Sequence, residues 1–345
     1  MENRFLGKSG LEVSVFGFGC MTFSDGTGRF GATGSTNGVD AARQIDLCIE
    51  HGVNFFDTAD VYAAGRSEEI LGEALGKKRK RVVVATKAFH RMGKGPHDTG
   101  LSRRHLIDAC DASLRRLGTD WIDLYQVHNF DSLIPQEETL RALDDLVRAG
   151  KIRYIGCSNH AGWQLAKALG ISKEEHLAHY IGQQIQYSLV SRVAEEELLP
   201  CGVDMGVGAI IWSPLAQGFL SGKFRGETAG NTRLEQMNAL KGYDNQRCQD
   251  VLSVIDIIVE ARGSNVTHSQ VALNWVKARL GVTSILLGAR TDVQLLDNLG
   301  AANWSLSQEE IDTLDQASQI ALRYPVSAQQ NYGAERNPPV FKRFG

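Results

Sequence analysis

The chain has 345 residues, 22% of them charged and 43% hydrophobic, with a formal net charge of −3. This composition is ordinary for a globular protein, and the small negative charge excludes strong electrostatic attraction to nucleic acid or anionic lipid. The length allows one to three domains, but the sequence contains no linker, repeat or low-complexity tract. We therefore expect a single domain over residues 1–345, with a core of about residues 14–315.

The cysteines and the start of the chain bear on location. Six cysteines are scattered without a C-x-x-C pair, and the opening MENRFLGKSG lacks the apolar core of a signal peptide. No segment approaches the ~18 uninterrupted apolar residues of a membrane-spanning helix. These features predict free thiols, a cytoplasmic protein without a membrane or nucleic-acid partner, and no metal site.

Along the chain, an N-terminal segment RFLGKSGLEV is typical of a β-hairpin with its turn at residues 8–10. Eight short apolar runs of strand type follow it. They span residues 14–19, 53–57, 81–87, 121–128, 153–159, 183–188, 208–214 and 284–288. Their nearly continuous hydrophobicity is typical of parallel strands that are covered on both faces.

Helical segments separate these runs. The segment 40–52 places apolar residues around a helix and ends in glycine, and 102–118 opens on a cap-type serine and ends in glycine. The segment 135–150 has proline in its first turn, acidic residues early and arginine late, as the helix dipole favours. Further helices are predicted over 269–281, 291–300 and 307–319.

Eight strands alternating with helices over ~250 residues are typical of a (β/α)8 TIM barrel. The main competitor is an open doubly wound sheet, which usually carries a G-x-G-x-x-G turn after its first strand. The corresponding stretch here, VFGFGCMTF, does not match that pattern. We therefore expect an α/β TIM barrel with an N-terminal β-hairpin, which could close the bottom, and a C-terminal loop or tail.

Polar side chains stand at the ends of three successive predicted strands. Asp57 ends the second strand, Lys87 the third and His128 the fourth, while Tyr62 lies in the loop after the second. Active sites of TIM barrels lie at the C-terminal ends of the strands. We expect these four side chains to gather around one mouth, although each taken alone could be a helix cap, a solvated lysine or a core histidine.

Together the four groups make chemical sense. A tyrosine with its usual pKa of ~10 is a poor proton donor and acceptor near neutral pH, but a nearby ammonium favours the tyrosinate. Lys87 could supply that ammonium, Asp57 could keep it charged, and His128 could orient a substrate oxygen. A proton donor aimed at an oxygen that gains negative charge suits carbonyl reduction.

Five longer motifs carry a family resemblance over nearly the whole chain. They are NFFDTADVYAAGRSEEILGEAL, VVVATK, LRRLGTDWIDLYQVHNFD, LVRAGKIRYIGCSN and WSPLAQGFLSGK. In number and order they resemble the aldo-keto reductases, in particular the potassium-channel β-subunit-like and bacterial branches. The resemblance implies a TIM barrel, reduction of carbonyl compounds with NADP(H), and Asp57, Tyr62, Lys87 and His128 as a catalytic tetrad.

The resemblance also implies where a nicotinamide dinucleotide would bind. Ser158, Asn159 and Gln184 would hold the carboxamide, and Trp212 would stack on the nicotinamide. The first-strand turn would lie beside the nicotinamide ribose, a later loop would wrap the pyrophosphate, and the last strand and helix would hold the adenosine. The remaining implied contacts are Gly19, Cys20, Met21, Asp57, Ser213, Leu215, Gly218, Lys223, Gly288, Arg290, Gln294, Asp297 and Asn298.

Two of these residues point to different cofactors. Arg290 offers charge for a 2′-phosphate, which favours NADP(H) over NAD(H). Asp297 offers a carboxylate, which can prefer the ribose hydroxyls of NAD(H). Phe23, Phe89, Phe130 and Trp212, with the loop 226–245 and the C-terminal tail, are candidates for lining an aromatic or apolar substrate pocket.

Three functions remain open at this point. The first is NADPH-dependent reduction of an aldehyde or ketone, a reversible reaction on a small-molecule carbonyl or alcohol. The second is a Schiff-base barrel enzyme that uses Lys87. The third is a cofactor-binding regulatory subunit with little turnover. The sequence leaves the natural substrate, the physiological direction and the oligomeric state open.

Overall fold

The computed structural model describes residues 1–26, 36–222, 242–243, 245–263, 266–329 and 332. Its parallel strands are β3 (Phe16–Gly19), β4 (Phe55–Asp57), β5 (Val83–Ala88), β6 (Ile122–Val127), β7 (Ile152–Ser158), β8 (Tyr180–Gln186), β9 (Gly208–Trp212) and β10 (Val282–Leu287). They close into a barrel in the order β10-β3-β4-β5-β6-β7-β8-β9. The predicted TIM barrel is confirmed, and each strand falls on one of the eight predicted runs.

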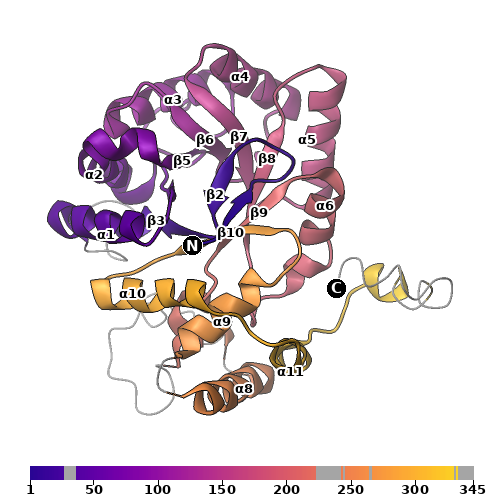
Figure 1. Ribbon diagram of the computed structural model, residues 1–345. Coiled ribbons are helices and arrows are strands. Elements are labelled where there is room, and N and C mark those ends of the chain that lie inside the picture. The colour runs from indigo at the N-terminus through magenta and orange to yellow at the C-terminus, as the bar shows by residue number, and fades with distance from the viewer. Residues whose placement is uncertain (27–35, 223–241, 244, 264–265, 330–331, 333–345) are drawn as a thin grey trace.

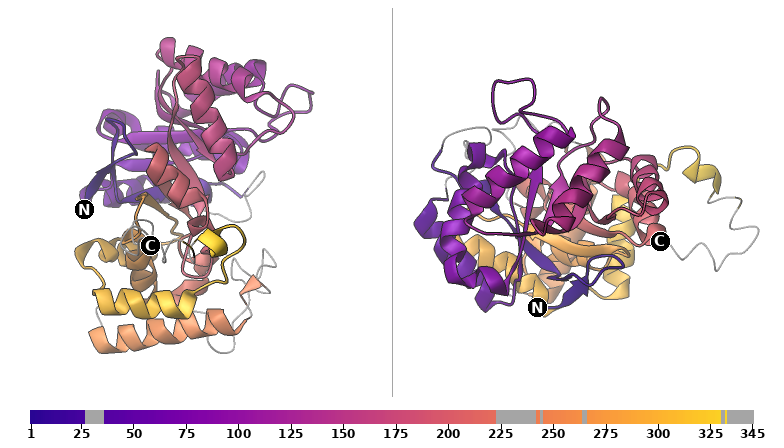
Figure 2. Two further views of the ribbon diagram at one scale, coloured as in Figure 1. Left: turned by 90° about the vertical axis from the view of Figure 1, so that its right-hand side faces the viewer. Right: turned by 90° about the horizontal axis from the view of Figure 1, so that it is seen from above.

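Helices surround this barrel (Figure 1). They are α1 (Gly38–Glu50), α2 (Arg66–Leu75), α3 (Arg103–Leu117), α4 (Gln136–Arg148), α5 (Gly162–Glu174), α6 (Leu198–Met205), α8 (Gln246–Arg262), α9 (His268–Lys277), α10 (Asp292–Gly300) and α11 (Gln308–Ser318). Helices α8 and α11 pack side by side (Figure 2). Within the described ranges, no helix is long and apolar enough to cross a membrane.

The two ends of α3 confirm the predicted serine and glycine caps. Ser102 precedes the helix, and its side chain accepts a hydrogen bond from the backbone N–H of His105 at 3.3 Å. Gly118 follows the helix with φ 60°, in the left-handed region that favours glycine. Pro135 differs slightly from its prediction, because it occupies the cap position before α4 rather than the first turn.

The N-terminal hairpin closes the bottom of the barrel. Strand β1 (Asn3–Phe5) pairs antiparallel with β2 (Glu12–Ser14), which confirms the predicted hairpin. Leu6 and Val13 are fully buried among the apolar side chains that fill the lower barrel interior. Gly7, with φ 59°, lies so close to the start of β9 that a Cβ would stand 2.4 Å from the carbonyl oxygen of Gly206.

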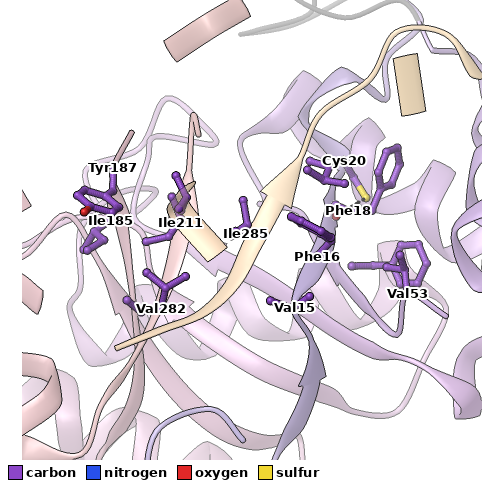
Figure 3. Packing of buried hydrophobic residues seen from close by; sticks show 14 of the residues in the cluster. Val15, Phe16, Phe18, Cys20, Val53, Ile185, Tyr187, Ile211, Val282 and Ile285 are labelled. Atoms are coloured by element: carbon purple, nitrogen blue, oxygen red, sulfur yellow. Dashed lines mark hydrogen bonds between the residues drawn. The ribbon is translucent and has the colours of Figure 1, made fainter. Parts of the chain in front are cut away.

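A second apolar core lies between the strands and the helices. Phe16 and Phe18 of β3 belong to it, together with Ile211 of β9 and Ile285 of β10 (Figure 3). Between the two phenylalanines, Gly17 lies close to Phe55 of the inner core, as expected from the two-residue repeat of a strand. Each buried large side chain contributes about 1.5–3 kcal/mol of transfer free energy, so these two cores fix the strands that present the site.

Candidate active site

The candidate site is formed by the layer of inward-pointing side chains directly above the apolar interior of the barrel. Phe55, Ala85 and Leu124 lie in that interior, on β4, β5 and β6. Because strand side chains alternate, the residue two positions later points inward as well. Those later residues are Asp57, Lys87 and Gln126. The two-residue repeat therefore converts three separate strand ends into one polar layer, directly above an apolar floor.

An ion pair occupies the centre of this layer. Lys87 Nζ lies 2.5 Å from Asp57 Oδ1, and both side chains are almost completely buried. Lys87 also donates to the carbonyl oxygen of Thr58 at 2.8 Å. The second carboxylate oxygen of Asp57 accepts from Gln126 Nε2 at 3.0 Å and from Gln184 Nε2 at 2.8 Å. The buried pair is therefore well hydrogen-bonded on both sides.

These partners keep the lysine charged. Burial lowers the pKa of Lys87, but the Asp57 carboxylate and the hydroxyl of Tyr62 raise it more, so the net pKa lies above that of a free lysine. Sequence reasoning missed Gln126, although a buried amide two residues after an inward leucine was a readable signal.

Tyr62 and His128 stand next to this pair, at the opening of the barrel. Both are half-buried, and their ring centroids lie 5.8 Å apart with the rings nearly perpendicular at 82°. Lys87 Nζ lies 5.1 Å from the centroid of the Tyr62 ring. The structure thus brings together all four residues that the strand ends predicted.

Unusual backbone conformations cluster around this opening. Immediately after Tyr62, Ala63 and Ala64 have φ values of 48° and 54°, in the left-handed region that disfavours residues with a Cβ. The same region holds Asn159 after β7 and Ser213 after β9, both with φ 56°. Such strain persists only where the surrounding structure enforces it, and it concentrates at functional sites.

The residues implied for the carboxamide are continuous with the ion pair. Ser158 Oγ and the backbone N–H of Asn159 both donate to the carbonyl oxygen of Gln184, at 3.0 and 3.2 Å. Asn159 Nδ2 donates to the carbonyl oxygen of His128 at 3.0 Å. Gln184 in turn reaches Asp57 through its side chain. One hydrogen-bonded network therefore joins the two groups of predicted residues.

Trp212 stands at the end of β9, next to this network. Its indole nitrogen is buried without a hydrogen-bond partner among the described residues. It lines a cavity of about 420 Å³ together with Asn159, Gln186, Glu196 and Arg323. A buried indole N–H usually has a hydrogen-bond partner, so Trp212 can still donate a hydrogen bond to a bound group.

The loop after Trp212 has the shape of a backbone cradle. Ser213 Oγ accepts from the N–H of Gln217 at 3.2 Å, which closes a tight turn around Leu215. Gly218 has φ 99°, and apart from its chain neighbours none of the described residues places an atom within 4 Å of the position that a Cβ would take there. Lys223, the fourth residue predicted for this loop, lies outside the described residues, as does most of the predicted lining loop 226–245.

At the first-strand turn, Gly19 and Met21 are half-buried while Cys20 is fully buried. Burial raises the pKa of the Cys20 thiol well above its ordinary value. The thiol packs in the outer core, and the residue as a whole is fully buried.

The residues implied for the adenosine end lie around the start of α10. Gly288 and Arg290 are exposed, and the backbone N–H of Arg290 donates to Gln294 Oε1 at 3.0 Å. Asn298 is buried beneath them.

Asp297 is engaged elsewhere. Thr267 Oγ1 donates to one of its carboxylate oxygens and Gln270 Nε2 to the other, both at 3.1 Å. Both partners belong to the start of α9, so this carboxylate ties α10 to α9.

The comparison with known proteins decides the family. The Aldo/keto reductase family matches residues 16–319, which include every barrel strand. The chain belongs to the aldo/keto reductase family. This aldo/keto reductase is therefore an oxidoreductase, and the resemblance carried by its motifs is confirmed.

Three of its relatives bear two kinds of name. A Bacillus subtilis (strain 168) protein named "Uncharacterized oxidoreductase YrpG" is 36% identical over 330 residues, which cover 91% of this chain and 95% of the relative. An Arabidopsis thaliana protein named "Probable voltage-gated potassium channel subunit beta" is 36% identical over 339 residues, covering 95% and 99%. A protein of the same name from Oryza sativa subsp. japonica is 34% identical over 329 residues, covering 91% and 96%.

A further charged cluster of this aldo/keto reductase lies behind the ion pair and was missed from the sequence. Glu68 of α2 is fully buried, where it accepts a hydrogen bond from Thr86 Oγ1 at 2.6 Å. Arg116 of α3 pairs with its other oxygen at 2.6 Å. Because Thr86 precedes Lys87 in β5, this cluster braces the strand that carries the lysine.

Asp60 lies near this cluster without comparable support. It is fully buried, and neither carboxyl oxygen has a hydrogen-bond partner among the described side chains. Burial raises the pKa of Asp60 well above its usual range, Glu68 raises it further, and Arg116, the Val61 amide and Lys87 offset only part of this rise.

This environment predicts a pH-dependent gain in stability for Asp60→Asn. A raised folded-state pKa means that the contribution of Asp60 to stability is fully present below the unfolded value of about 3.9 and is lost as the pH rises through the folded pKa. Asparagine does not titrate. Urea unfolding should show the variant more stable by about 1–3 kcal/mol near neutral pH, with the two proteins converging below about pH 4.

The exposed Asp120 offers a control. Asp120→Asn should follow the wild type at every pH. If Asp60→Asn and the wild type showed the same pH dependence of unfolding, the assignment of Asp60 as a destabilising buried acid would be wrong.

Proposed function

We propose that this aldo/keto reductase reduces an aldehyde or ketone to an alcohol, with Tyr62 protonating the carbonyl oxygen. NADPH, when bound, supplies the hydride that the carbonyl carbon receives. The observation that carries the proposal is the buried Asp57–Lys87 ion pair beside the Tyr62 ring. An ion pair in this position has a clear use in proton transfer and little use in a merely structural barrel.

The residues divide the proton chemistry between them. Tyr62 is half-buried at the opening, so its hydroxyl can meet a substrate oxygen. After it gives up its proton, the phenolate is stabilised by the ammonium of Lys87, whose raised pKa keeps it charged at neutral pH. Asp57 holds the ammonium in place, and the ring of His128 beside Tyr62 can donate a hydrogen bond that orients the substrate oxygen.

The surrounding residues fit a nicotinamide dinucleotide. Trp212 offers a flat indole with an unsatisfied N–H, and Asn159 offers an exposed amide in a strained backbone position. The open space around Gly218 suits a backbone cradle for phosphate oxygens. We assign Gly19, Cys20, Met21, Ser158 and Gln184 to the same ligand, as the motifs imply.

The adenosine end supports NADPH over NADH. Arg290 is exposed directly before α10, where the helix dipole already favours a phosphate group. Asp297, which could have favoured the ribose hydroxyls of NADH, is bonded to Thr267 and Gln270. The carboxylate that favoured NADH therefore already accepts two hydrogen bonds, whereas the guanidinium that favoured NADPH belongs to an exposed residue.

Of the alternatives, a Schiff-base mechanism on Lys87 fits poorly. An amine that attacks a carbonyl must be neutral and accessible, whereas Lys87 is fully buried, ion-paired and raised in pKa. A cofactor-binding regulatory subunit is the second candidate, because two relatives of comparable identity bear channel-subunit names. The six unpaired cysteines favour a cytoplasmic location for either function.

Tyr62→Phe tests the proposed reaction because it removes the proton donor and keeps the ring. We expect wild type to consume NADPH with members of a panel of aldehydes and ketones. The variant should lose about 100-fold or more of kcat for the best substrate, while its NADPH affinity, measured by fluorescence titration, stays unchanged.

Three outcomes distinguish the candidates. Steady-state rates of Tyr62→Phe close to wild type would remove Tyr62 from the mechanism. Tight NADPH binding by wild type without turnover of any carbonyl in the panel would favour the regulatory subunit. Borohydride trapping of a substrate onto Lys87 would revive the Schiff-base reading.

Arg290→Ala tests the cofactor preference. A guanidinium can form charge-assisted hydrogen bonds to a 2′-phosphate worth about 1.5–3 kcal/mol, and NADH lacks that phosphate. The variant should bind NADPH about tenfold or more weakly than wild type, with little change for NADH. If wild type binds both cofactors equally, or if the mutation weakens both equally, the 2′-phosphate does not lie at Arg290.

A further inference from the structure

A third ring stands beside the two aromatic residues of the proposed mechanism. His90 follows β5 by two residues, and its ring centroid lies 4.7 Å from that of His128, with the rings at 73°. His128 therefore contacts two rings, those of Tyr62 and His90. Both histidines are half-buried, like Tyr62. The motifs of the sequence did not single out His90.

The chain fixes His90 in this position from both ends. The carbonyl oxygen of Phe89, the preceding residue, accepts hydrogen bonds from Gly100 N at 2.8 Å and Thr99 Oγ1 at 3.1 Å. These bonds close the base of the loop that carries His90. The ring itself is 3.2 Å from Asn129, measured from Nε2 to the amide nitrogen Nδ2.

That contact assigns a tautomer to the His90 ring. With Asn129 Nδ2 as the donor, Nε2 accepts, and a neutral imidazole then carries its proton on Nδ1. Asn129 directly follows His128 in the chain. The side chain that orients His90 is therefore attached to the same turn as the ring on which His90 packs.

The main chain of His128 is held by a hydrogen bond on each side. Its N–H donates to the carbonyl oxygen of Ala88 at 3.0 Å, and its carbonyl oxygen accepts from Asn159 Nδ2 at 3.0 Å. With the backbone held, the remaining freedom of His128 is rotation of the imidazole. A ring packed edge-on at 4.7 Å restricts that rotation.

We propose that His90 is a positioning residue for the carbonyl reduction: its ring, oriented by Asn129, packs on His128 and holds that imidazole beside Tyr62, where the substrate oxygen binds. The role rests on the proposed function and acts through His128 rather than on the substrate. Catalysis depends on such orientation, because a small misplacement of a reacting group can cost as much as ~100-fold in rate.

Kinetics of three variants test the role. His90→Ala removes the packing ring and should lower kcat about tenfold, with KM for the carbonyl and the affinity for NADPH changed little. His90→Phe restores a planar ring and should recover most of kcat. His97→Ala is the control, because His97 is exposed in the same loop, and it should match wild type.

A spectroscopic readout makes the test independent of turnover. Long-range proton–nitrogen NMR spectra of the histidine rings should show His90 as the Nδ1–H tautomer, and His90→Ala should shift the ring signals of His128. Wild-type kcat in His90→Ala, or no rescue by His90→Phe, overturns the proposal.

If no carbonyl is reduced by wild type, the proposed function fails instead. The NMR spectra then test the packing and orientation of His90 without any measurement of turnover. Unchanged His128 signals in His90→Ala contradict its packing on His128. An Nε2–H tautomer of His90 in wild type contradicts its orientation by Asn129.

Discussion

The ion pair between Asp57 and Lys87 is the interaction on which the rest of the site depends. Burying two charges is costly, and the cost is recovered only where geometry is good and the remaining polar atoms are hydrogen-bonded. Here Gln126 and Gln184 satisfy the carboxylate, and the carbonyl of Thr58 satisfies the ammonium. Removing either charge alone would leave the other buried and unpaired, at a cost of about 3–5 kcal/mol.

The barrel supplies the conditions that this pair needs. Below it, apolar side chains and the N-terminal hairpin fill the interior. Behind it, the Glu68–Arg116 pair braces β5. Above it, Tyr62, His128 and His90 line the opening. Gln184 links the pair to the residues assigned to the cofactor, so the proposed proton chemistry and the proposed cofactor site share one network.

The sequence predicted the features that depend on neighbouring residues and missed those that depend on contacts between distant segments. Strand and helix positions depend on local periodicity, and all eight strands were predicted. The four mechanistic residues were predicted because each ends or follows a strand. Gln126 and His90 were missed because their partners lie on other strands and loops. Asp60 was missed because its burial without a partner among the described side chains arises only once the elements have packed. Asp297 illustrates the same limit, since its bonds to Thr267 and Gln270 could not be read from its own helix.

The central claim, that the Lys87 ammonium acts on Tyr62, is tested most directly by the pH dependence of alcohol oxidation with NADP+ in Lys87→Met. Without the ammonium, the tyrosinate that accepts the proton forms only at higher pH. The double variant Asp57→Asn with Lys87→Met leaves no unpaired buried charge and guards against misfolding. The account predicts that both rate profiles move to higher pH relative to wild type. Profiles that coincide with wild type in folded variants would contradict it.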